Sequence, residues 1–231
     1  MRRLWWVSVA LTTALPAAAA AQEAHRTVVV DFTSLPSGFS DFGAARVRFD
    51  TLVAERLREA GFAVVPAESS EAVWKRNVDS VGGFYDTYSG KLIHAKFAAV
   101  RAGALRELQS RFRADAWLHP MIEVRVASFD GSQVDWDGVR EASGAVGGMV
   151  KLLFGSDQGT TQALSLVVEA ETIDGKTFYT RAGGIQLLRK VYREGLLSVP
   201  RASLFADASR TAAAVHIALD AFTPAVLDSI H

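Results

Sequence analysis

Two pairs of closely spaced carboxylates are the residues of this chain whose types and spacing best fit chemistry. Asp135 and Asp137 flank Trp136, and Glu169 and Glu171 stand two residues apart in an apolar run. Because side chains alternate between the faces of a strand, each pair shares one face if its segment is extended. Neighbouring carboxylates serve as a general acid and base or hold a divalent cation. The pattern is also typical of the solvated face of a half-buried strand, which is the interpretation we favour.

Other patterns for catalysis, metal binding and phosphate binding find no support in the sequence. There is no cysteine, which excludes thiol chemistry and disulfides, and no G-x-S-x-G elbow for a serine nucleophile. The glycine-rich run 144–148 lacks the Lys-Ser/Thr of a phosphate loop. We interpret His119, which precedes Pro120, as a structural histidine. No pair has the helical spacing of a zinc site among the five histidines, His25, His94, His119, His216 and His231. We therefore predict no catalytic residue, metal or cofactor.

Two segments are candidates for contact with a partner. The turn-rich loop Gly82–Lys91 carries aromatic side chains that supply rigid contact area: Phe84, Tyr85 and Tyr88. We favour a loop that folds these rings onto the body of the protein. The run 146–154 is apolar, and its large side chains are Met149, Leu152, Leu153 and Phe154. A short helix packed on a sheet is the favoured interpretation, and an exposed patch for a partner or a membrane surface is the alternative.

The elements that must position these residues begin with a β-α-β unit. Thr27–Phe32 is apolar on both faces, as a central parallel strand is. A helix is predicted from a cap at Ser40 or Asp41 to Ala60, with Gly61 as its C-terminal glycine. Its expected inward residues are Val47, Leu52, Val53, Leu57 and Ala60. Phe62–Pro66 is predicted to be the second strand.

The rest of the chain predicts two further helices, an antiparallel meander and a closing helix. Ser69 or Ser70 caps a short helix, and His94–Phe112 forms a longer one. Ala116–Phe129 is strand-like, with Leu118, Ile122, Val124 and Val126 on one side, and Asp130-Gly131 turns it. Leu164–Glu171 alternates and turns at Asp174-Gly175. Leu204–Phe222 is predicted to be the last helix. The fold class is therefore α/β (α+β): a single domain with a mixed β-sheet, an antiparallel meander and helices packed on the sheet.

The first residues predict export. Arg2 and Arg3 precede an apolar run and the small residues Ala17–Ala21, which is the layout of a signal peptide. We expect residues 1–21 to be the signal peptide and 22–231 to be one periplasmic domain; a transmembrane anchor is the alternative. The 25 basic and 25 acidic residues balance, so the chain lacks the basic footprint of a nucleic-acid binder.

Short motifs resemble an envelope α/β domain found in the curli-secretion channel protein and at the amino terminus of the translocation protein TolB. They are the strand Thr27–Phe32, the helix end and strand Ala60–Pro66, the strand entry Arg113–Leu118 and the hairpin Leu164–Tyr179. The resemblance implies a non-catalytic assembly or interaction module in the periplasm. The chain has neither a lipidation cysteine nor an evident pair of membrane-crossing hairpins, so the resemblance does not extend to pore formation.

The sequence thus predicts a non-catalytic periplasmic protein that binds other proteins of the cell envelope through loops and a sheet edge. Two alternatives stay open. One is a periplasmic hydrolase or small-ligand binder that uses a carboxylate pair such as Asp135 and Asp137. The other is an oligomeric ring or pore component built through Gly144–Gly155. We expect no nucleic-acid partner, and no membrane contact through residues 146–154.

Overall fold

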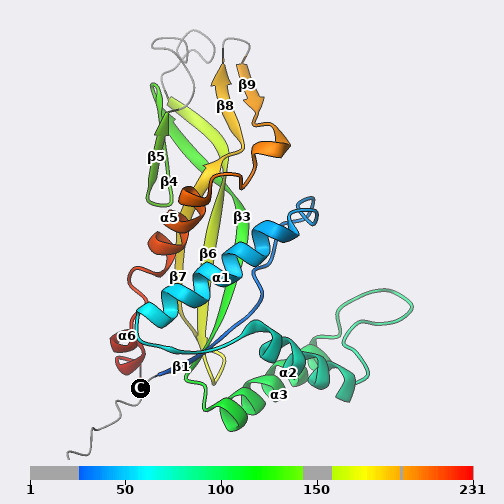
Figure 1. The fold of residues 1–231 in the computed structure, drawn as a ribbon. Helices are drawn as coiled ribbons and strands as arrows, with labels where there is room; N and C mark the ends of the chain where they lie inside the picture. Colours follow the sequence, from blue (N-terminus) through cyan, green and yellow to red (C-terminus); the bar gives the residue numbers. More distant parts are fainter. Residues whose placement is uncertain (1–25, 143–157, 193–194, 231) are drawn as a thin grey trace, which may run out of the picture.

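A mixed sheet of seven strands forms the centre of the fold (Figure 1). The computed structural model describes residues 26–142, 158–192 and 195–230. The strand order is β2-β1-β3-β4-β5, with β6 beside β3 and β7 beside β6, and β8 and β9 form a separate pair. This confirms the predicted single α/β domain with a mixed sheet. The strands are β1 (Thr27–Val30), β2 (Ala63–Val65), β3 (Ala116–Asp130), β4 (Gln133–Trp136), β5 (Val139–Ala142), β6 (Gln158–Thr172), β7 (Thr177–Leu187), β8 (Arg189–Tyr192) and β9 (Gly195–Ser198).

Helices cover both faces of the sheet. The helices α1 and α5 pack on one face, where their apolar side chains join the largest core around Phe49 and Leu219. The helices α2 and α3 pack on the opposite face, around Val73 and Leu108 (Figure 1). The helices are α1 (Gly43–Glu59), α2 (Ala67–Ser80), α3 (His94–Phe112), the 3-10 turn η1 (Arg201–Ser203), α5 (Ala208–Leu219) and α6 (Pro224–Asp228).

The position of β1 in the sheet explains why this strand is apolar on both faces. It lies between β2 and β3 and is parallel to both. Val28 and Val30 contact the core under α1 and α5, whereas Val29 contacts the core under α2 and α3. A central parallel strand buries both of its faces in this way. The strand ends at Val30, so Asp31 and Phe32, which the sequence assigned to it, lie just beyond its carboxyl end.

The strands β3 and β6 run antiparallel to each other over 15 residues each. Near the far end of β3 burial changes face: Ala127 and Phe129 join a third core with Trp136. Val124 and Val126, predicted to face the core, are 41% and 72% exposed. That prediction is wrong because the strand extends beyond the part of the sheet that α1 and α5 cover, and burial passes to the opposite face, where Ala127 and Phe129 share a core with side chains of β4.

Two predicted details of α1 are wrong. The helix begins at Gly43 after Phe42, with no side-chain cap. Asp41 instead forms an ion pair with Arg201. Val47, predicted to face inward, is 59% exposed, and Phe49 takes the buried position, four residues before Val53. The buried face of α1 is therefore rotated about the helix axis relative to the predicted face.

The predicted closing helix Leu204–Phe222 is shorter in the structure, where α5 spans Ala208–Leu219, and a separate helix, α6, follows it. Pro224 begins α6 at its first turn, a position where the missing N–H of proline costs no hydrogen bond. Among the described residues, no helix combines the length and the apolar character needed to cross a bilayer. The predicted signal peptide and the apolar run 146–154, with Met149, Leu152, Leu153 and Phe154, lie outside the described residues.

Candidate functional site

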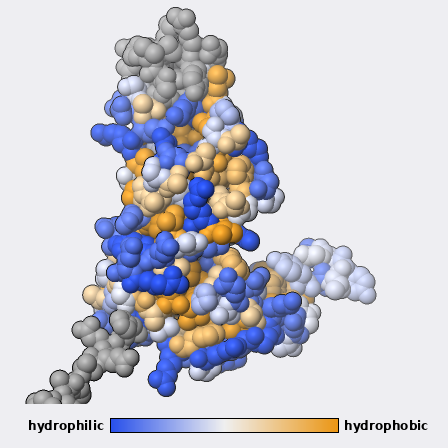
Figure 2. All heavy atoms as spheres, in the orientation of Figure 1, coloured by the Kyte–Doolittle hydropathy of each residue, from blue (hydrophilic) through white to orange (hydrophobic). Residues whose placement is uncertain are grey.

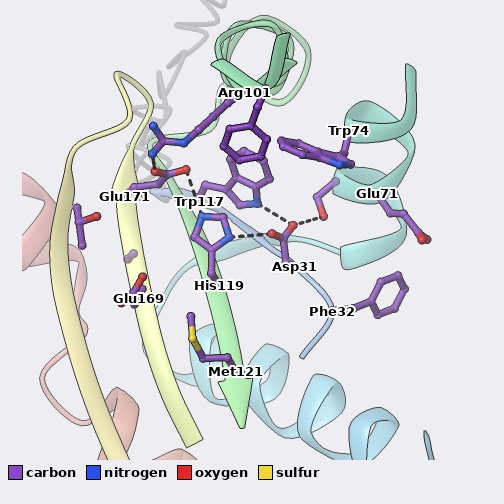
Figure 3. Close-up of a pocket in the computed structure, with 14 residues that line it drawn as sticks. Asp31, Phe32, Glu71, Trp74, Arg101, Trp117, His119, Met121, Glu169 and Glu171 are labelled. Carbon is purple, nitrogen blue, oxygen red and sulfur yellow. Dashed lines mark hydrogen bonds and ion pairs between the residues drawn. The ribbon is translucent and has the colours of Figure 1, made fainter. Parts of the chain in front are cut away.

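A cavity of about 550 Å³ opens beside the carboxyl end of β1 (Figure 3). Its volume falls within the range of small-molecule sites. Ligands of open α/β sheets bind in the same place, beyond the carboxyl ends of parallel strands. Six elements or their ends surround it, and the lining residues discussed below are Asp31, Phe32, Ser70, Glu71, Trp74, Phe97, Arg101, Trp117, His119, Met121, Glu169 and Glu171.

The sheet register places the polar side chains of the cavity on one face. Trp117, His119 and Met121 alternate along β3 and therefore point to the same side. His119 is paired with Glu169 on β6, and Trp117 with Glu171. The four neighbours in these two pairs share that face. The sequence pattern correctly placed the two glutamates together, and β3 adds the histidine between them.

The end of β1 brings Asp31 to the same face. Val29 is paired with Trp117 in the parallel ladder, and the Asp31 amide donates to the Leu118 carbonyl at 2.9 Å. Because side chains alternate, Asp31 follows Val29 onto the side of His119. Asp31 is thus held by the backbone opposite the histidine.

Two helices complete the wall, each through a pair of residues four positions apart. Ser70 and Trp74 lie on α2, and Phe97 and Arg101 lie on α3. Residues four apart share one face of a helix. Ser70, predicted as a helix cap, lies inside the first turn and is buried. Its side chain faces the sheet and not the helix end.

Four charged side chains form a chain of alternating sign across the cavity floor (Figure 3). Asp31 Oδ2 lies 2.8 Å from His119 Nδ1, and His119 Nε2 lies 3.2 Å from Glu171 Oε1. Arg101 forms an ion pair with Glu171 and donates to the Gly175 carbonyl at 3.0 Å. The second Asp31 oxygen accepts from Trp117 Nε1 at 2.8 Å and from Ser70 Oγ at 2.7 Å.

This arrangement holds His119 in its protonated form. Burial disfavours the imidazolium, but the hydrogen bonds and charges of Asp31 and Glu171 outweigh it and raise the pKa of His119 to about 9. Burial also disfavours the Glu171 carboxylate, but His119 and Arg101 outweigh burial and lower the pKa of that carboxyl. At neutral pH His119 is therefore a cation and Glu171 an anion, and the formal charges of the two acidic and two basic groups cancel.

The cluster lacks the geometry of a nucleophile beside a base. A protonated His119 donates both ring N–H groups to carboxylates and has no lone pair left to accept a proton. Ser70 is 1% exposed, and its hydroxyl contacts Asp31 and not the imidazole. The order of contacts is Ser–Asp–His, whereas a catalytic triad places the histidine between the serine and the carboxylate.

Aromatic rings form the apolar wall. Trp74 lies 5.9 Å from Phe97 and 6.1 Å from Trp117, measured between ring centroids. Phe84 of the predicted partner loop adds to this wall at 5.4 Å from Phe97. Such tilted and edge-on pairs are the favoured arrangement of aromatic rings. The predicted inward folding of the loop thus holds for Phe84, which is half-buried.

The other two rings of the loop are exposed. Tyr85 is 59% exposed, and Tyr88 is 99% exposed. Asp86 accepts from the Tyr88 and Ser89 amides and so fixes the turn. Figure 2 shows this loop standing out from the body of the molecule. The prediction that all three rings fold onto the body is therefore wrong for the two tyrosines.

Of the two predicted carboxylate pairs, Glu169 and Glu171 line the cavity, whereas Asp135 and Asp137 lie elsewhere. Asp135 is half exposed and pairs with Arg140. Asp137 lies beyond the end of β4 in a turn, with φ +39°, and accepts from Ser165 Oγ at 2.7 Å, so it does not share a strand face with Asp135. Neither lines the cavity. Their role as a pair is thus not supported by their placement.

Glu169 and Glu171 line the cavity, and only one of them is neutralised there. The Glu171 side chain is 6% exposed, so its assignment to a solvated face is wrong: Arg101 of α3 and His119 of β3 both contact it. Glu169 is half-buried and makes no hydrogen bond or ion pair within the part of the chain that the structure describes. No group of three or more metal-binding side chains occurs among the described residues either.

Sequence reasoning missed several lining residues, above all Asp31, Arg101 and Trp74. One signal was available: Asp31 is the first polar residue after the first strand of a β-α-β unit, where α/β sheets place their ligands. The positions of Arg101 and Trp74 depend on how α2 and α3 pack on each other, which spacing within one helix does not reveal.

Neither protein-family models nor curated proteins give a match to this chain.

Proposed function

We propose that this is a periplasmic protein that binds a small ligand in the cavity beside the end of β1 and does not transform it. The observation that carries the proposal is the cavity of about 550 Å³, in which an aromatic wall faces ionised side chains. Small-molecule sites combine a mostly apolar lining with a few fixed polar groups in this way. The signal-peptide pattern of residues 1–21 supports the periplasmic location.

Binding fits the cavity better than bond chemistry does. The imidazolium of His119 is fixed by Asp31 and Glu171, and the Ser70 hydroxyl is buried against Asp31. General base catalysis needs a group that is free to take a proton near neutral pH. A fixed network instead holds the shape of a cavity constant while ligands enter and leave.

A thermal-shift screen tests this proposal. Purified mature protein is heated with a panel of amines, carboxylates, amino acids, sugars and nucleosides. A ligand at one hundred times its Kd stabilises the native state by about 2.7 kcal/mol, which raises Tm by several degrees. Trp74→Ala removes part of the wall and should abolish the shift, whereas Tyr88→Ala, outside the cavity, should preserve it. A panel without a shift, or a shift that survives Trp74→Ala, would argue against the cavity.

A second candidate function is contact with an envelope protein through the loop Gly82–Lys91. Tyr85 and Tyr88 are large, exposed and held on an ordered turn, and tyrosine is enriched in binding hot spots. A photo-crosslinking amino acid at position 88, compared with one at the exposed Val126, tests this in intact cells. A partner captured at position 88 alone supports docking. Identical products at both positions refute it.

A further inference from the structure

The charges around the cavity do not cancel. The floor of the cavity is neutral as a unit because Asp31, His119, Glu171 and Arg101 alternate in sign and contact one another. Two carboxylates remain: Glu71 in the second turn of α2, and Glu169 on β6. Neither has an ion pair within the described parts of the chain. The cavity therefore presents a net negative charge to its contents.

The positive groups of the floor are poorly placed to receive an anion. Both ring nitrogens of His119 are directed at carboxylates. Arg101 is directed at Glu171 and at the Gly175 carbonyl. An anionic ligand would have to compete with these contacts while it approached Glu169. The electrostatics thus disfavour a carboxylate or phosphate ligand.

Glu169 is placed to receive a cation. It lies beside His119 in the sheet register, half-buried on the β6 side of the cavity. Figure 3 shows Phe32 and Trp74 on the opposite side and Met121 between them. Glu71 projects away from the centre in the same view, so it contributes charge at the rim and not a direct contact.

The apolar wall suits the rest of such a ligand. Aromatic faces attract cations, and desolvation strengthens this attraction. Trp74, Phe97 and Trp117 form one continuous group of rings. An organic ammonium with an apolar body would place its charge at Glu169 and its body against Trp74 and Met121.

We propose that the cavity binds a small organic cation, with Glu169 as the residue that recognises its charge. This inference rests on the proposed ligand-binding function and adds the chemical class of the ligand. A hydrogen bond to a charged group is stronger than one between neutral groups, so loss of the Glu169 charge should weaken binding at least about tenfold.

Three probes of similar shape and different charge test the inference: phenethylamine, 2-phenylethanol and phenylacetate. Isothermal titration calorimetry at pH 7 measures the Kd of each for the mature protein. We expect phenethylamine to bind at least about tenfold more tightly than 2-phenylethanol, and phenylacetate to bind least. Added salt should weaken the binding of the amine alone, because only that interaction is between opposite charges.

Two variants assign the effect to its residue. Glu169→Gln should remove the preference for the amine and leave the Kd of the alcohol within about twofold. Asp135→Asn makes the same change of charge outside the cavity and should preserve the preference. Circular dichroism checks that both variants fold, which we expect because Glu169 has no partner among the described residues and the Asp135–Arg140 pair is exposed.

Three results would overturn the inference. If 2-phenylethanol or phenylacetate binds as tightly as phenethylamine or more tightly, the cavity does not prefer a cation, although it still binds small ligands. An unchanged preference in Glu169→Gln would exclude this residue. A failure of phenethylamine to bind at about 10 mM, against a typical weak Kd near 1 mM, would exclude this class of cation. The thermal-shift panel decides the ligand-binding function separately.

Discussion

The ion pairs of His119 stabilise this protein at neutral pH, and this stabilisation should be lost as the pH rises into the alkaline range. The pKa of His119 is raised from 6.5 to about 9 in the folded state by Asp31 and Glu171. A group whose folded pKa exceeds its unfolded pKa contributes stability that is complete below the unfolded value. This contribution is lost as pH rises through the folded value. The window for His119 therefore runs from about pH 6.5 to about pH 9.

The size of the contribution follows from the shift. One pKa unit corresponds to about 1.4 kcal/mol, so the interval from 6.5 to about 9 gives about 3 kcal/mol below pH 6. About 1 kcal/mol of it is left at pH 8. The His119 side chain is 30% exposed, and solvent screening makes these values upper bounds.

Urea unfolding at a series of pH values between 5.5 and about 9.5 measures this contribution. Wild type is compared with His119→Gln, in which position 119 stays uncharged. The free energy of unfolding of wild type should fall by up to about 3 kcal/mol more than that of the variant across the window. The variant should also be less stable at pH 7, because Asp31 and Glu171 lose the cation between them.

A second measurement does not depend on the variant. Carbon–proton NMR of the imidazole ring titrates His119 directly in the native protein, and His119→Gln assigns its signal. A pKa at or below 6.5 would refute the reasoning, as would parallel stability curves for wild type and variant. Tyr179, whose pKa is raised to about 12 by burial, is present in both proteins and cancels in the comparison.

Three further substitutions test the packing of the sheet. Gly183→Ala would place a Cβ 2.0 Å from the Ala214 carbonyl oxygen, so β7 and α5 must separate; urea unfolding should show a loss of about 3 kcal/mol or more. Tyr179→Phe removes the 2.6 Å hydrogen bond to the Ala218 carbonyl and should cost about 1–2 kcal/mol by the same assay. Phe49→Ala empties a fully buried position and should cost about 3–5 kcal/mol, seen in calorimetry as a Tm lowered by many degrees.

Local patterns predicted those parts of the fold that depend on neighbouring residues. The helix His94–Phe112 was predicted with its observed bounds, and Asp130-Gly131 and Asp174-Gly175 do join antiparallel strands. In these segments periodicity and turn chemistry act within a few residues. The exposure of Val124 was not predictable in this way, because it depends on where helices distant in sequence end.

The candidate site was harder to predict because it is assembled from distant segments. Asp31, His119 and Glu171 are separated by 88 and 52 positions, yet they form adjacent hydrogen bonds. The spacing of Glu169 and Glu171 showed that they share a face, but which elements cover that face is set by the sheet order. The sequence around His119 does not indicate its role, because Asp31 contacts the imidazole only through the pairing of β1 with β3.

The parallel pairing of β1 with β3 has a consequence for how fast the chain folds. The segment joining the two strands is nearly the length of a small domain, so its closure entropy must be overcome before the pairing is stabilised. Topologies with such distant contacts fold slowly. We expect the meander of β6 and β7, joined at Asp174-Gly175, to form early and β1 to dock late. The ionisation of His119 would then report the docking step, because Asp31 reaches the imidazole only when β1 arrives.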